Sequence, residues 1–376
     1  MKVYLIEPFC IGKEHIINNI TFLESFFDDE RVSDVKFFSD KKHGEEVLGL
    51  LDITTKTEKK IEFISIRIDR SNYFKRVLNE FINTCRVFFL SEKNTVLLFL
   101  SINETSQLIV KLLNVIFKRK IVLIPHAILT TLNENVSSGR YAWLKKILCF
   151  EFWIGKLNSK KIKYLILGKH IEVKMKAMNK LDGVNYLVIP LPYLYDEGVD
   201  NFRQCSNKLT ISFIGVGSKD KNIEKFYQLA AKYEGVIQFK HLGVLASDCT
   251  LLPEKYGLNI SYDSMIPYET LKEGIINSDY IYMNLERKSY ELRASATFFD
   301  CINLGKPLII DRDSFYYDSE LINESHDIGI KLSFHEDLCE ALEGVSSDDY
   351  YNMQVNIYEL KNKILGFNYC EAVIND

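Results

Sequence analysis

The sequence predicts an α/β protein with two doubly wound, Rossmann-like domains, each built on a parallel β-sheet. Short runs of β-branched and aromatic residues alternate with longer helical patterns along all 376 residues, which is typical of parallel strands joined by crossover helices. The alternation stops at 190–208, a polar stretch with two prolines near its start, and then begins again. A chain of this length is also too long for one ordinary core. We therefore expect two domains joined near residue 200.

The first domain is predicted to span residues 1–195. Its expected strands are short apolar runs separated by helical patterns, at 2–6, 34–38, 61–66, 95–100, 121–124, 164–167 and 186–189. Because each run is followed by a stretch long enough for a crossover helix, the strands are expected to be parallel.

The second domain is predicted to span residues 205–345. The same reasoning places its strands at 209–215, 236–243, 258–261, 279–285 and 306–310. A long helical pattern at 347–367 comes after this sheet is complete. We expect the C-terminal segment 346–376 to be helical and to pack back on the first domain.

Composition limits the class of protein and its partners. The chain is 47% hydrophobic and 26% charged, the balance of a soluble globular protein. Its formal net charge of −4 favours no nucleic-acid partner. The eight cysteines form no CxxC pair and no Cys/His cluster at metal spacing, which predicts free thiols and no metal site. The first residues do not resemble a signal peptide, and no apolar run approaches about 20 residues, so we expect a cytoplasmic protein.

A turn with two glycines follows the strand at 209–215. Gly215 and Gly217 would let the backbone approach a ligand, and Ser218 and Lys219 lie just before the next helix, whose N-terminus favours phosphate. Asp220 occupies the third glycine position of the dinucleotide fingerprint. The pattern is therefore equally consistent with a tight structural turn.

A second polar turn lies in "YELRASATFFDCINLGKP", residues 290–307. If Arg293 to Thr297 form the first turn of a helix, several N–H groups, two hydroxyls and one guanidinium lie at the carboxyl edge of the sheet, where open α/β folds bind ligands. The structural alternative is a capped helix with a solvated charged face. The candidate ligand-binding residues of this stretch are Glu286, Tyr290, Arg293, Ser295, Ala296 and Thr297.

The two halves, the "FIGVGSKDKN" turn and the "YELRASATFFDCINLGKPLII" segment resemble glycosyltransferases of the GT-B fold, and most closely bacterial enzymes that build surface polysaccharides such as O-antigen, capsule or lipopolysaccharide. The resemblance implies that the C-terminal domain binds a nucleotide-sugar donor as substrate. It implies that the N-terminal domain binds a glycan or lipid-linked acceptor, and that neither a cofactor nor a metal is required.

The chain departs from the family pattern at two places. Ala296 follows Ser295 where the family often has glycine, which leaves less room beside the backbone. Retaining members often carry two glutamates separated by seven residues, whereas Glu286 is followed eight positions later by Ala294, and Glu291 by Phe299. The missing pair favours an inverting transfer.

An inverting transfer needs a base to accept the proton of the acceptor hydroxyl, and histidine suits this task near neutral pH. His126 directly follows the strand at 121–124 and is the best placed of the seven histidines. Glu134 and Glu7 are weaker candidates for the same role. His241 follows strand-like residues and is a candidate contact for the nucleotide base or ribose. Each of the two histidines is equally consistent with a structural role.

The segment 140–164 contains both tryptophans and seven basic residues against one acid, Glu151. Aromatic and basic residues together favour an anionic membrane surface, so we expect peripheral association with the inner face of the cell membrane. An ordinary core helix followed by a basic loop, or an RNA-binding patch, is consistent with the same composition.

Two other functions fit the same architecture. A sugar-nucleotide epimerase would have the same two-domain shape, and a nucleotide- or glycan-binding module would keep the fold without the chemistry. Release of free nucleotide only when an acceptor is present would indicate the transferase.

Overall fold

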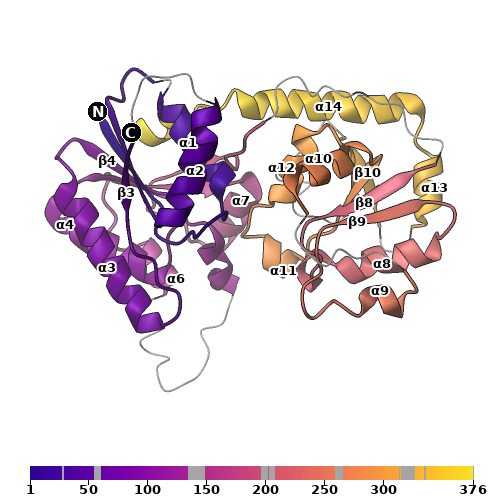
Figure 1. Cartoon of the computed structure of the whole chain (residues 1–376), viewed down its shortest axis with the longest axis horizontal. Coiled ribbons are helices and arrows are strands. Elements are labelled where there is room, and N and C mark those ends of the chain that lie inside the picture. Colours follow the sequence, from indigo (N-terminus) through magenta and orange to yellow (C-terminus); the bar gives the residue numbers. More distant parts are fainter. Residues whose placement is uncertain are drawn as a thin grey trace. The chain divides into compact units, whose positions relative to one another are not determined.

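The computed structural model describes residues 1–27, 29–54, 61–133, 149–195, 202, 208–258, 266–312, 314, 327–333 and 336–375. The chain forms two compact units (Figure 1). The first unit contains Met1–Leu194, Leu292–Ala294 and Asn368–Asp376. The second unit contains Tyr195–Glu291 and Ser295–Phe367. Three residues of the 290–307 segment therefore belong to the first unit, although both chain neighbours of this tripeptide belong to the second.

The first unit is built on a seven-stranded parallel sheet with the order β3-β2-β1-β4-β5-β6-β7. All seven predicted strands are present, at β1 (Lys2–Ile6), β2 (Asp34–Ser39), β3 (Ile61–Ser65), β4 (Thr95–Phe99), β5 (Lys120–Leu123), β6 (Ile162–Leu167) and β7 (Tyr186–Ile189). The order reverses between β1 and β4, where Lys2 pairs with both Asp34 and Thr95. Such a reversal opens a crevice at the carboxyl ends of the strands.

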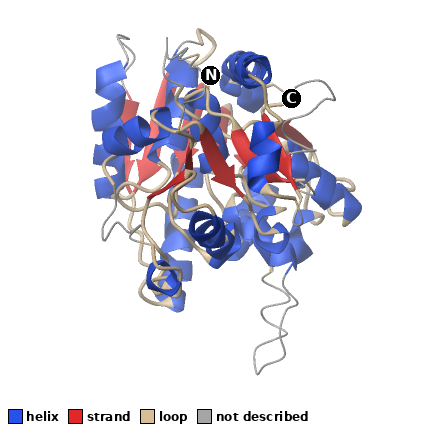
Figure 2. Cartoon of the chain, turned by 90° about the vertical axis from the view of Figure 1, so that its right-hand side faces the viewer, coloured by secondary structure: helices blue, strands red, loops and turns tan. Residues whose placement is uncertain are grey.

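Helices pack on this sheet, among them α2 on β2 and β3, and α7 on β6 and β7. Figure 2 distinguishes the strands of the chain, in red, from its helices, in blue. The helix α1 packs against α2 and α15, and α3 packs against α4. The bounds of the described helices in this unit are α1 (Ile16–Phe27), α2 (Lys41–Thr54), α3 (Tyr73–Leu90), α4 (Glu104–Phe117), the 3₁₀ helix η1 (Ala127–Asn133), α6 (Phe150–Ile154), α7 (Lys169–Ala177) and α15 (Tyr369–Ile374). The core lies between these helices and the sheet, whose strand β4 is buried throughout.

The second unit is built on a five-stranded parallel sheet with the order β12-β11-β10-β8-β9. Four predicted strands are present, at β8 (Thr210–Ile214), β9 (Gln238–Leu242), β10 (Tyr280–Met283) and β11 (Leu308–Asp311). Three residues of the strand expected at 258–261 lie outside the described residues. The sequence did not predict β12 (Gly329–Leu332), because this run is only four residues long and includes a glycine and a lysine. The order reverses between β8 and β10.

The described helices of the second unit are η2 (Lys219–Lys221), α8 (Ile223–Lys232), α9 (Leu252–Lys255), α10 (Tyr268–Ile276), α11 (Arg287–Tyr290), α12 (Ala296–Asn303), α13 (Leu338–Glu343) and α14 (Ser347–Leu365). Helix α14 begins with a capping box between Ser346 and Asp349, which satisfies orphan N–H groups of its first turn. It packs on α12, and the Lys361 Nζ donates to the Asn303 carbonyl.

The C-terminal segment is divided between the two units. Helix α14 belongs to the second unit, whereas α15 belongs to the first. The Tyr369 hydroxyl donates to the Leu191 carbonyl, and its ring contacts Phe22 edge to face. The Lys120 Nζ donates a hydrogen bond to the Ile374 carbonyl, which also holds α15 on the first unit. Among the described helices, none has the length and apolarity that a membrane crossing requires.

Candidate functional site

The glycine turn after β8 is shaped by its close approach to the end of β9. Gly215 has a φ of +81°, a conformation that favours glycine. A Cβ on Gly243 would lie 1.8 Å from the Gly215 carbonyl oxygen, and a Cβ on Gly217 would lie 2.9 Å from the His241 ring. Packing within the protein therefore requires glycine at these positions whether or not a ligand binds.

Replacing Gly243 with alanine is expected to lower the free energy of unfolding by about 1–3 kcal/mol, because the added methyl group overlaps backbone that cannot move away. Gly49→Ala is the matched control. Gly49 lies in α2 with nothing within 4 Å of the added Cβ, so alanine there is expected to raise stability by about 0.5–1 kcal/mol. Thermal unfolding of the two variants measures both changes in stability. Equal shifts of the melting temperature in the two variants would contradict this account of the turn.

The two lysines of the turn have different surroundings. Lys219 is exposed and forms an ion pair with Asp248 at 3.0 Å. The Lys221 Nζ instead donates to the Thr297 hydroxyl at 3.3 Å and lies 3.3 Å from the Cβ position of Gly215. Lys219 was predicted as a site residue and Lys221 was not, because the spacing of the two lysines in the sequence does not reveal which side chain points over the ends of the strands.

Backbone contacts join this turn to the segment that follows β10. The Glu286 N–H donates to the Asp220 carbonyl at 2.8 Å, and the Asn222 side-chain amide donates to the Asn284 carbonyl at 3.3 Å. Asn222 has a φ of 49°, a left-handed conformation that asparagine tolerates better than most residues. The turn and the later segment are therefore one structure at the carboxyl edge of the second sheet.

The residues of the 290–307 segment take several positions. Glu286 caps α11 through the Ser289 N–H, and although burial acts in the opposite direction, hydrogen bonds from Ser289 lower its pKa. Tyr290 is buried. Ser295 occupies the N-cap of α12, but its side chain does not cap the helix. Ala296 is exposed at the first helical position, and Thr297 contacts Lys221.

Arg293 belongs to the first unit with its two neighbours. Its backbone carbonyl lies 3.1 Å from the Nε2 atom of His170, a buried residue of α7. Helix α12 begins at Ala296 with Ser295 as its N-cap, so Arg293 does not lie in the helical turn in which the sequence places it with Ser295 and Thr297.

His241 lies behind the glycine turn and does not reach its surface. The ring is fully buried; its Nδ1 lies 3.2 Å from the Tyr227 hydroxyl and its Nε2 lies 3.1 Å from the Gly215 carbonyl oxygen. Burial lowers its pKa. Both nitrogens face protein atoms, so the expected contact with a nucleotide is replaced by a supporting position under Gly215.

In the first unit, His126 follows β5 and meets a second histidine, His15. The two rings are perpendicular, with centroids 4.6 Å apart. Burial, with smaller effects of His15 and Arg293, lowers the pKa of His126 to about 3. The His126 imidazole is therefore neutral near pH 7 and can accept a hydrogen bond or a proton. His15 was not predicted, because it lies in a turn with no predicted strand or motif beside it.

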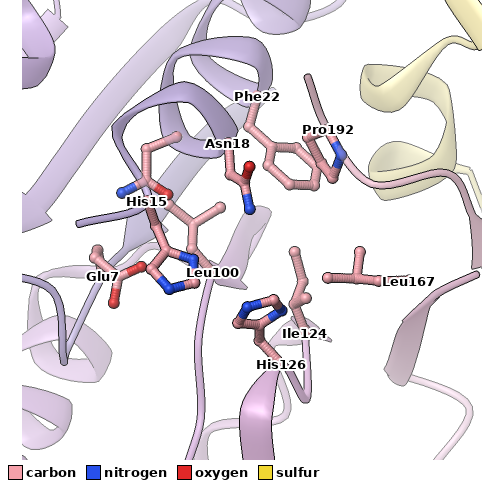
Figure 3. Close-up of a pocket in the computed structure, with 10 residues that line it drawn as sticks. Glu7, His15, Asn18, Phe22, Leu100, Ile124, His126, Leu167 and Pro192 are labelled. Atoms are coloured by element: carbon pink, nitrogen blue, oxygen red, sulfur yellow. The ribbon is translucent and has the colours of Figure 1, made fainter. Parts of the chain in front are cut away.

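Glu7 lies at the same strand edge as the two histidines. Figure 3 shows Glu7, His15 and His126 around one small pocket. One oxygen of Glu7 accepts hydrogen bonds from the Phe9 and Cys10 N–H groups and from the Ser101 hydroxyl. Since three donors already hold this carboxylate, its main effect is to fix the loop that follows β1.

A larger cavity of about 420 Å³ lies beside the histidines, within the size range of small-molecule sites. Its lining includes both histidines and two ion-pairing residues, Arg70 and Glu14, whose Nη2 and Oε2 atoms are 2.5 Å apart. Arg76 also lines it. Hydroxyl-rich ligands suit such a lining, because it offers both donors and acceptors.

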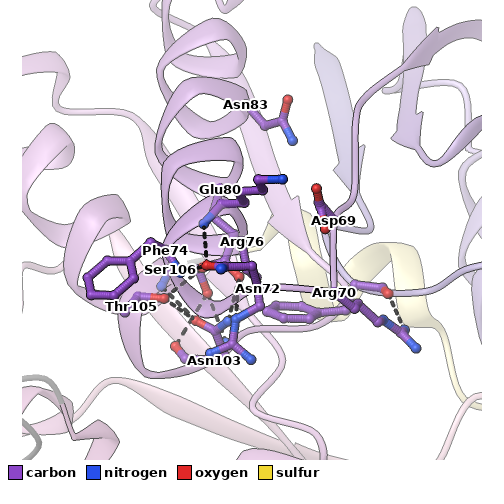
Figure 4. A network of polar contacts seen from close by, with 12 residues as sticks. Asp69, Arg70, Asn72, Phe74, Arg76, Glu80, Asn83, Asn103, Thr105 and Ser106 are labelled. Carbon is purple, nitrogen blue, oxygen red and sulfur yellow. Dashed lines mark hydrogen bonds and ion pairs between the residues drawn. The ribbon is translucent and has the colours of Figure 1, made fainter.

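A buried polar network supports one wall of this cavity (Figure 4). Glu80 of α3 is 4% exposed; it accepts hydrogen bonds from the Asn103 amide at 2.7 Å and the Thr105 hydroxyl at 2.6 Å. Burial raises the pKa of Glu80. Asn103 also caps α4 through the Ser106 N–H. The network therefore fixes the start of α4 against the middle of α3.

Two candidates from the sequence fall partly or wholly outside the described residues. Glu134 lies outside them, as does 140–148 of the basic aromatic segment. In the remainder, Ile162, Lys163 and Tyr164 are buried in β6, so Lys163 does not reach the surface as the membrane interpretation requires. Its Nζ donates to the Asn375 carbonyl. Lys156, Lys160 and Lys161 are exposed.

No group of three or more His, Cys, Asp or Glu side chains is arranged to hold a metal ion within the part of the chain that the structure describes. None of the seven cysteines in that part forms a disulfide.

By sequence, the chain matches no protein-family model and no curated protein. By structure, it is similar to a sucrose-phosphate synthase from Thermosynechococcus elongatus, with a TM-score of 0.64, 12% identity, and coverage of 99% of this chain and 96% of the other. It is also similar to HepE from Anabaena, solved with UDP and glucose, with a TM-score of 0.63, 10% identity, and coverage of 99% and 98%.

A third similar structure is the lipopolysaccharide outer core galactosyltransferase WaaB, with a TM-score of 0.57, 13% identity, and 99% coverage of both chains. At such identities the likeness establishes the fold. The predicted fold class is confirmed: two Rossmann-like parallel-sheet domains that match the GT-B fold of known glycosyltransferases.

Proposed function

We propose that this protein is a glycosyltransferase that moves a sugar from a nucleotide-sugar donor to a glycan acceptor. The observation that carries the proposal is the cluster of Gly215, Lys221 and Thr297 at the carboxyl ends of β8 and β10, in a chain that shares the fold of known glycosyltransferases. In open α/β sheets, ligands bind at this edge where the strand order reverses.

The donor would bind to the second unit through its diphosphate. The Lys221 ammonium supplies a charge-assisted hydrogen bond to phosphate. Helix α12 begins at the exposed Ala296, and its first N–H groups favour an anion. We propose that Lys221 and the hydroxyls of Ser295 and Thr297 stabilise the leaving diphosphate without a metal or cofactor. The phosphate contact expected of Arg293 from the sequence remains a separate prediction. The neighbour HepE was solved with UDP and glucose, which makes a uridine nucleotide the first donor to test.

The acceptor would bind to the first unit in the cavity of about 420 Å³ beside His126 and His15. We propose that His126 accepts the proton of the attacking hydroxyl, with Glu134 and Glu7 as alternative bases. The missing glutamate pair supports inversion at the anomeric carbon. We further propose a bacterial surface glycan or a lipid-linked glycan as acceptor, in line with the lipopolysaccharide named for WaaB.

A lipid-linked acceptor would be reached at the inner face of the cell membrane. The proposed contact through 140–164 relies on Lys156, Lys160 and Lys161 in its described part, since each basic residue near an anionic leaflet adds about 1 kcal/mol of attraction. The buried Lys163 contributes nothing to it.

The donor site is tested by a pair of neighbouring lysines. Lys221→Ala is expected to weaken nucleotide-sugar binding by roughly 10- to 100-fold, because a hydrogen bond to a charged group contributes about 1.5–3 kcal/mol. Lys219→Ala is the matched control and is expected to change affinity by less than about twofold, since an exposed ion pair contributes little. Titration calorimetry against a panel of nucleotide sugars measures both.

Equal losses in the two lysine variants would remove Lys221 from the site. If no nucleotide sugar binds, the transferase proposal and the epimerase alternative both fail. If one binds, release of free nucleotide only in the presence of an acceptor glycan supports the transferase. Interconversion of sugar nucleotides without an acceptor would indicate the epimerase, and binding without turnover would indicate the binding module.

A further inference from the structure

Helices α3 and α4 turn large apolar side chains to the outside of the first unit. The two helices lie next to each other (Figure 1). Phe74 is 81% exposed, and Phe89 and Ile116 are each 74% exposed. We define the α3–α4 apolar face by its exposed residues, which are Tyr73, Phe74, Leu78, Phe81, Ile82, Phe89, Leu90, Leu112, Val115 and Ile116.

The buried sides of the same helices carry polar groups. The buried polar residues are Glu80 and Thr84 of α3 and Gln107, Lys111 and Asn114 of α4, beside the apolar Val87, Phe88 and Val110. An ordinary surface helix has the opposite arrangement, with its apolar stripe toward the core and its polar side toward water. Both helices therefore depart from this arrangement, because each buries several polar residues while large apolar residues stay exposed.

Hydrogen bonds to the buried polar residues hold the two helices in this orientation. Glu80 is bonded to Asn103 and Thr105, and the Gln107 amide donates to the Tyr164 hydroxyl at 2.9 Å. The Lys111 Nζ donates to the Lys156 carbonyl and the Asn158 side chain, each at 2.7 Å. Rotation of either helix to bury its apolar side would break these hydrogen bonds. The buried polar groups would then lack partners, which costs free energy of folding. The exposed apolar face is consequently a stable feature of the fold.

The charges around the face are mainly basic. Exposed basic residues in 73–118 are Lys75, Arg86, Lys93 and Lys118. Within those residues, all of which the structure describes, the acids that are not buried are Glu92 and Glu104, and Glu92 is paired with Lys2. The local excess of positive charge stands in a chain whose formal net charge is −4.

We propose that the α3–α4 apolar face docks on an anionic membrane surface, with its apolar side chains in the headgroup and acyl boundary and its basic residues at the lipid phosphates. Helices with aromatic and aliphatic residues on one side and Lys or Arg beside them bind membranes in this manner. Four of the ten residues of the face are aromatic, and aromatic rings favour the interface.

A second copy of the chain fits the face less well than a membrane does. A two-fold contact places the same patch on both subunits. The basic residues Lys75, Arg86 and Lys118 would then gather at one interface with few acids to balance them. An anionic leaflet neutralises the same residues.

The proposal differs from the contact through 140–164, because it names other elements and includes an apolar surface. It deepens the proposed function at a lipid-linked acceptor, but the docking needs no donor and no turnover. Vesicle binding measured without any nucleotide sugar therefore tests the docking alone, and its failure leaves the donor-binding test unaffected.

The test is co-sedimentation of the full chain with phosphatidylcholine vesicles that contain or lack phosphatidylglycerol, at low and at physiological ionic strength. The unmodified chain is expected to bind the anionic vesicles, and less tightly as salt rises. A triple variant with Phe74→Ser, Leu78→Ser and Phe89→Ser is expected to bind more than about tenfold more weakly, since three large apolar groups no longer enter the boundary. Neutralisation by Lys75→Gln, Arg86→Gln and Lys118→Gln is expected to weaken binding by about 100-fold.

The matched control replaces three exposed apolar residues of the second unit, with Val236→Ser, Leu251→Ser and Leu365→Ser, and is expected to bind like the unmodified chain. All the substitutions are at exposed positions, so unchanged melting temperatures verify folding. Failure of the unmodified chain to bind anionic vesicles at low salt overturns the proposal, and so does normal binding by the apolar variant. A dimer in solution that the apolar variant converts to a monomer would instead assign the face to a second copy.

Discussion

Replacing His126 with alanine is expected to lower the rate constant of sugar transfer by about 100-fold, with little change in donor affinity. General-base catalysis contributes roughly 10²- to 10⁴-fold. The lower end is expected because a base whose pKa is about 3 attracts the proton of a sugar hydroxyl weakly. His126→Asn should not restore the rate, since an amide accepts hydrogen bonds but not the proton. Single-turnover kinetics with saturating donor measure the effect.

The lowered pKa of His126 also predicts the pH profile. A base acts in its neutral form, and the neutral form of His126 prevails at every pH well above 3. We therefore expect no loss of kcat/KM from this group between about pH 8 and pH 5. His15→Asn removes one of the influences that lower the pKa of His126, so it should move the acid limb of the profile to higher pH.

Two results would contradict the role of His126. Near-normal turnover in both His126 variants would transfer the role to Glu134 or Glu7. Loss of donor binding together with turnover would show that the imidazole maintains the structure and does not take part in the reaction.

Replacing Lys111 with methionine is expected to lower the free energy of unfolding by about 3 kcal/mol, because the removal of one buried partner leaves several acceptors unpaired. The Lys111 side chain is fully buried. Its ammonium donates to the carbonyls of Trp153, Ile154 and Lys156 and to the Asn158 side chain. Methionine keeps the packing and loses all four bonds. In thermal unfolding the change corresponds to roughly 6–12 °C.

The cost of Lys111→Met is expected to depend on pH with a defined sign. Burial lowers the pKa of Lys111 from its ordinary value of 10.5 to about 7. Between these values the unfolded chain binds more protons than the folded chain, so the contribution of Lys111 to stability rises with pH. The difference in stability between the unmodified chain and the variant should therefore grow from pH 7 toward pH 10.5.

Lys161→Met is the control for this effect. Lys161 is exposed, and its Nζ donates to the Lys118 carbonyl at 2.8 Å. Its removal is expected to change stability by less than about 0.5 kcal/mol at any pH. A similar loss in both variants, or a difference that shrinks as the pH rises, would contradict the account of Lys111.

Most strands were predictable because the hydrophobic pattern that marks a strand lies within the strand's own few residues. Strand β4 is a run of apolar and β-branched residues that is buried at every position, and such runs predict a covered parallel strand directly. The boundary of β6 was not predictable, because Lys163 interrupts the apolar run. That lysine is accommodated only because the chain end supplies acceptors, among them the Asn375 carbonyl, at a distance of more than 200 residues in the sequence.

The sequence predicted where in the fold the candidate site lies, but it did not predict which side chains form it. The sequence located the turns after β8, β10 and β5, where parallel strands end together. It did not distinguish Lys221 from Lys219, because the direction of each side chain depends on contacts with Thr297 and Asp248, which come from later elements. His15 was missed for a related reason: its neighbour His126 comes from a different strand end.

The sequence by itself determined the alternation of strands and helices and the break near residue 200, because hydrophobic periodicity and turn residues act over short stretches of chain. Only the tertiary structure decided which side of α3 is buried. The sequence of α3 has an apolar stripe that local reasoning would turn inward. Glu80 instead faces inward, because Asn103 and Thr105 of the next helix start provide its hydrogen bonds. Buried polar groups must be paired, and their partners become known only when the chain is folded.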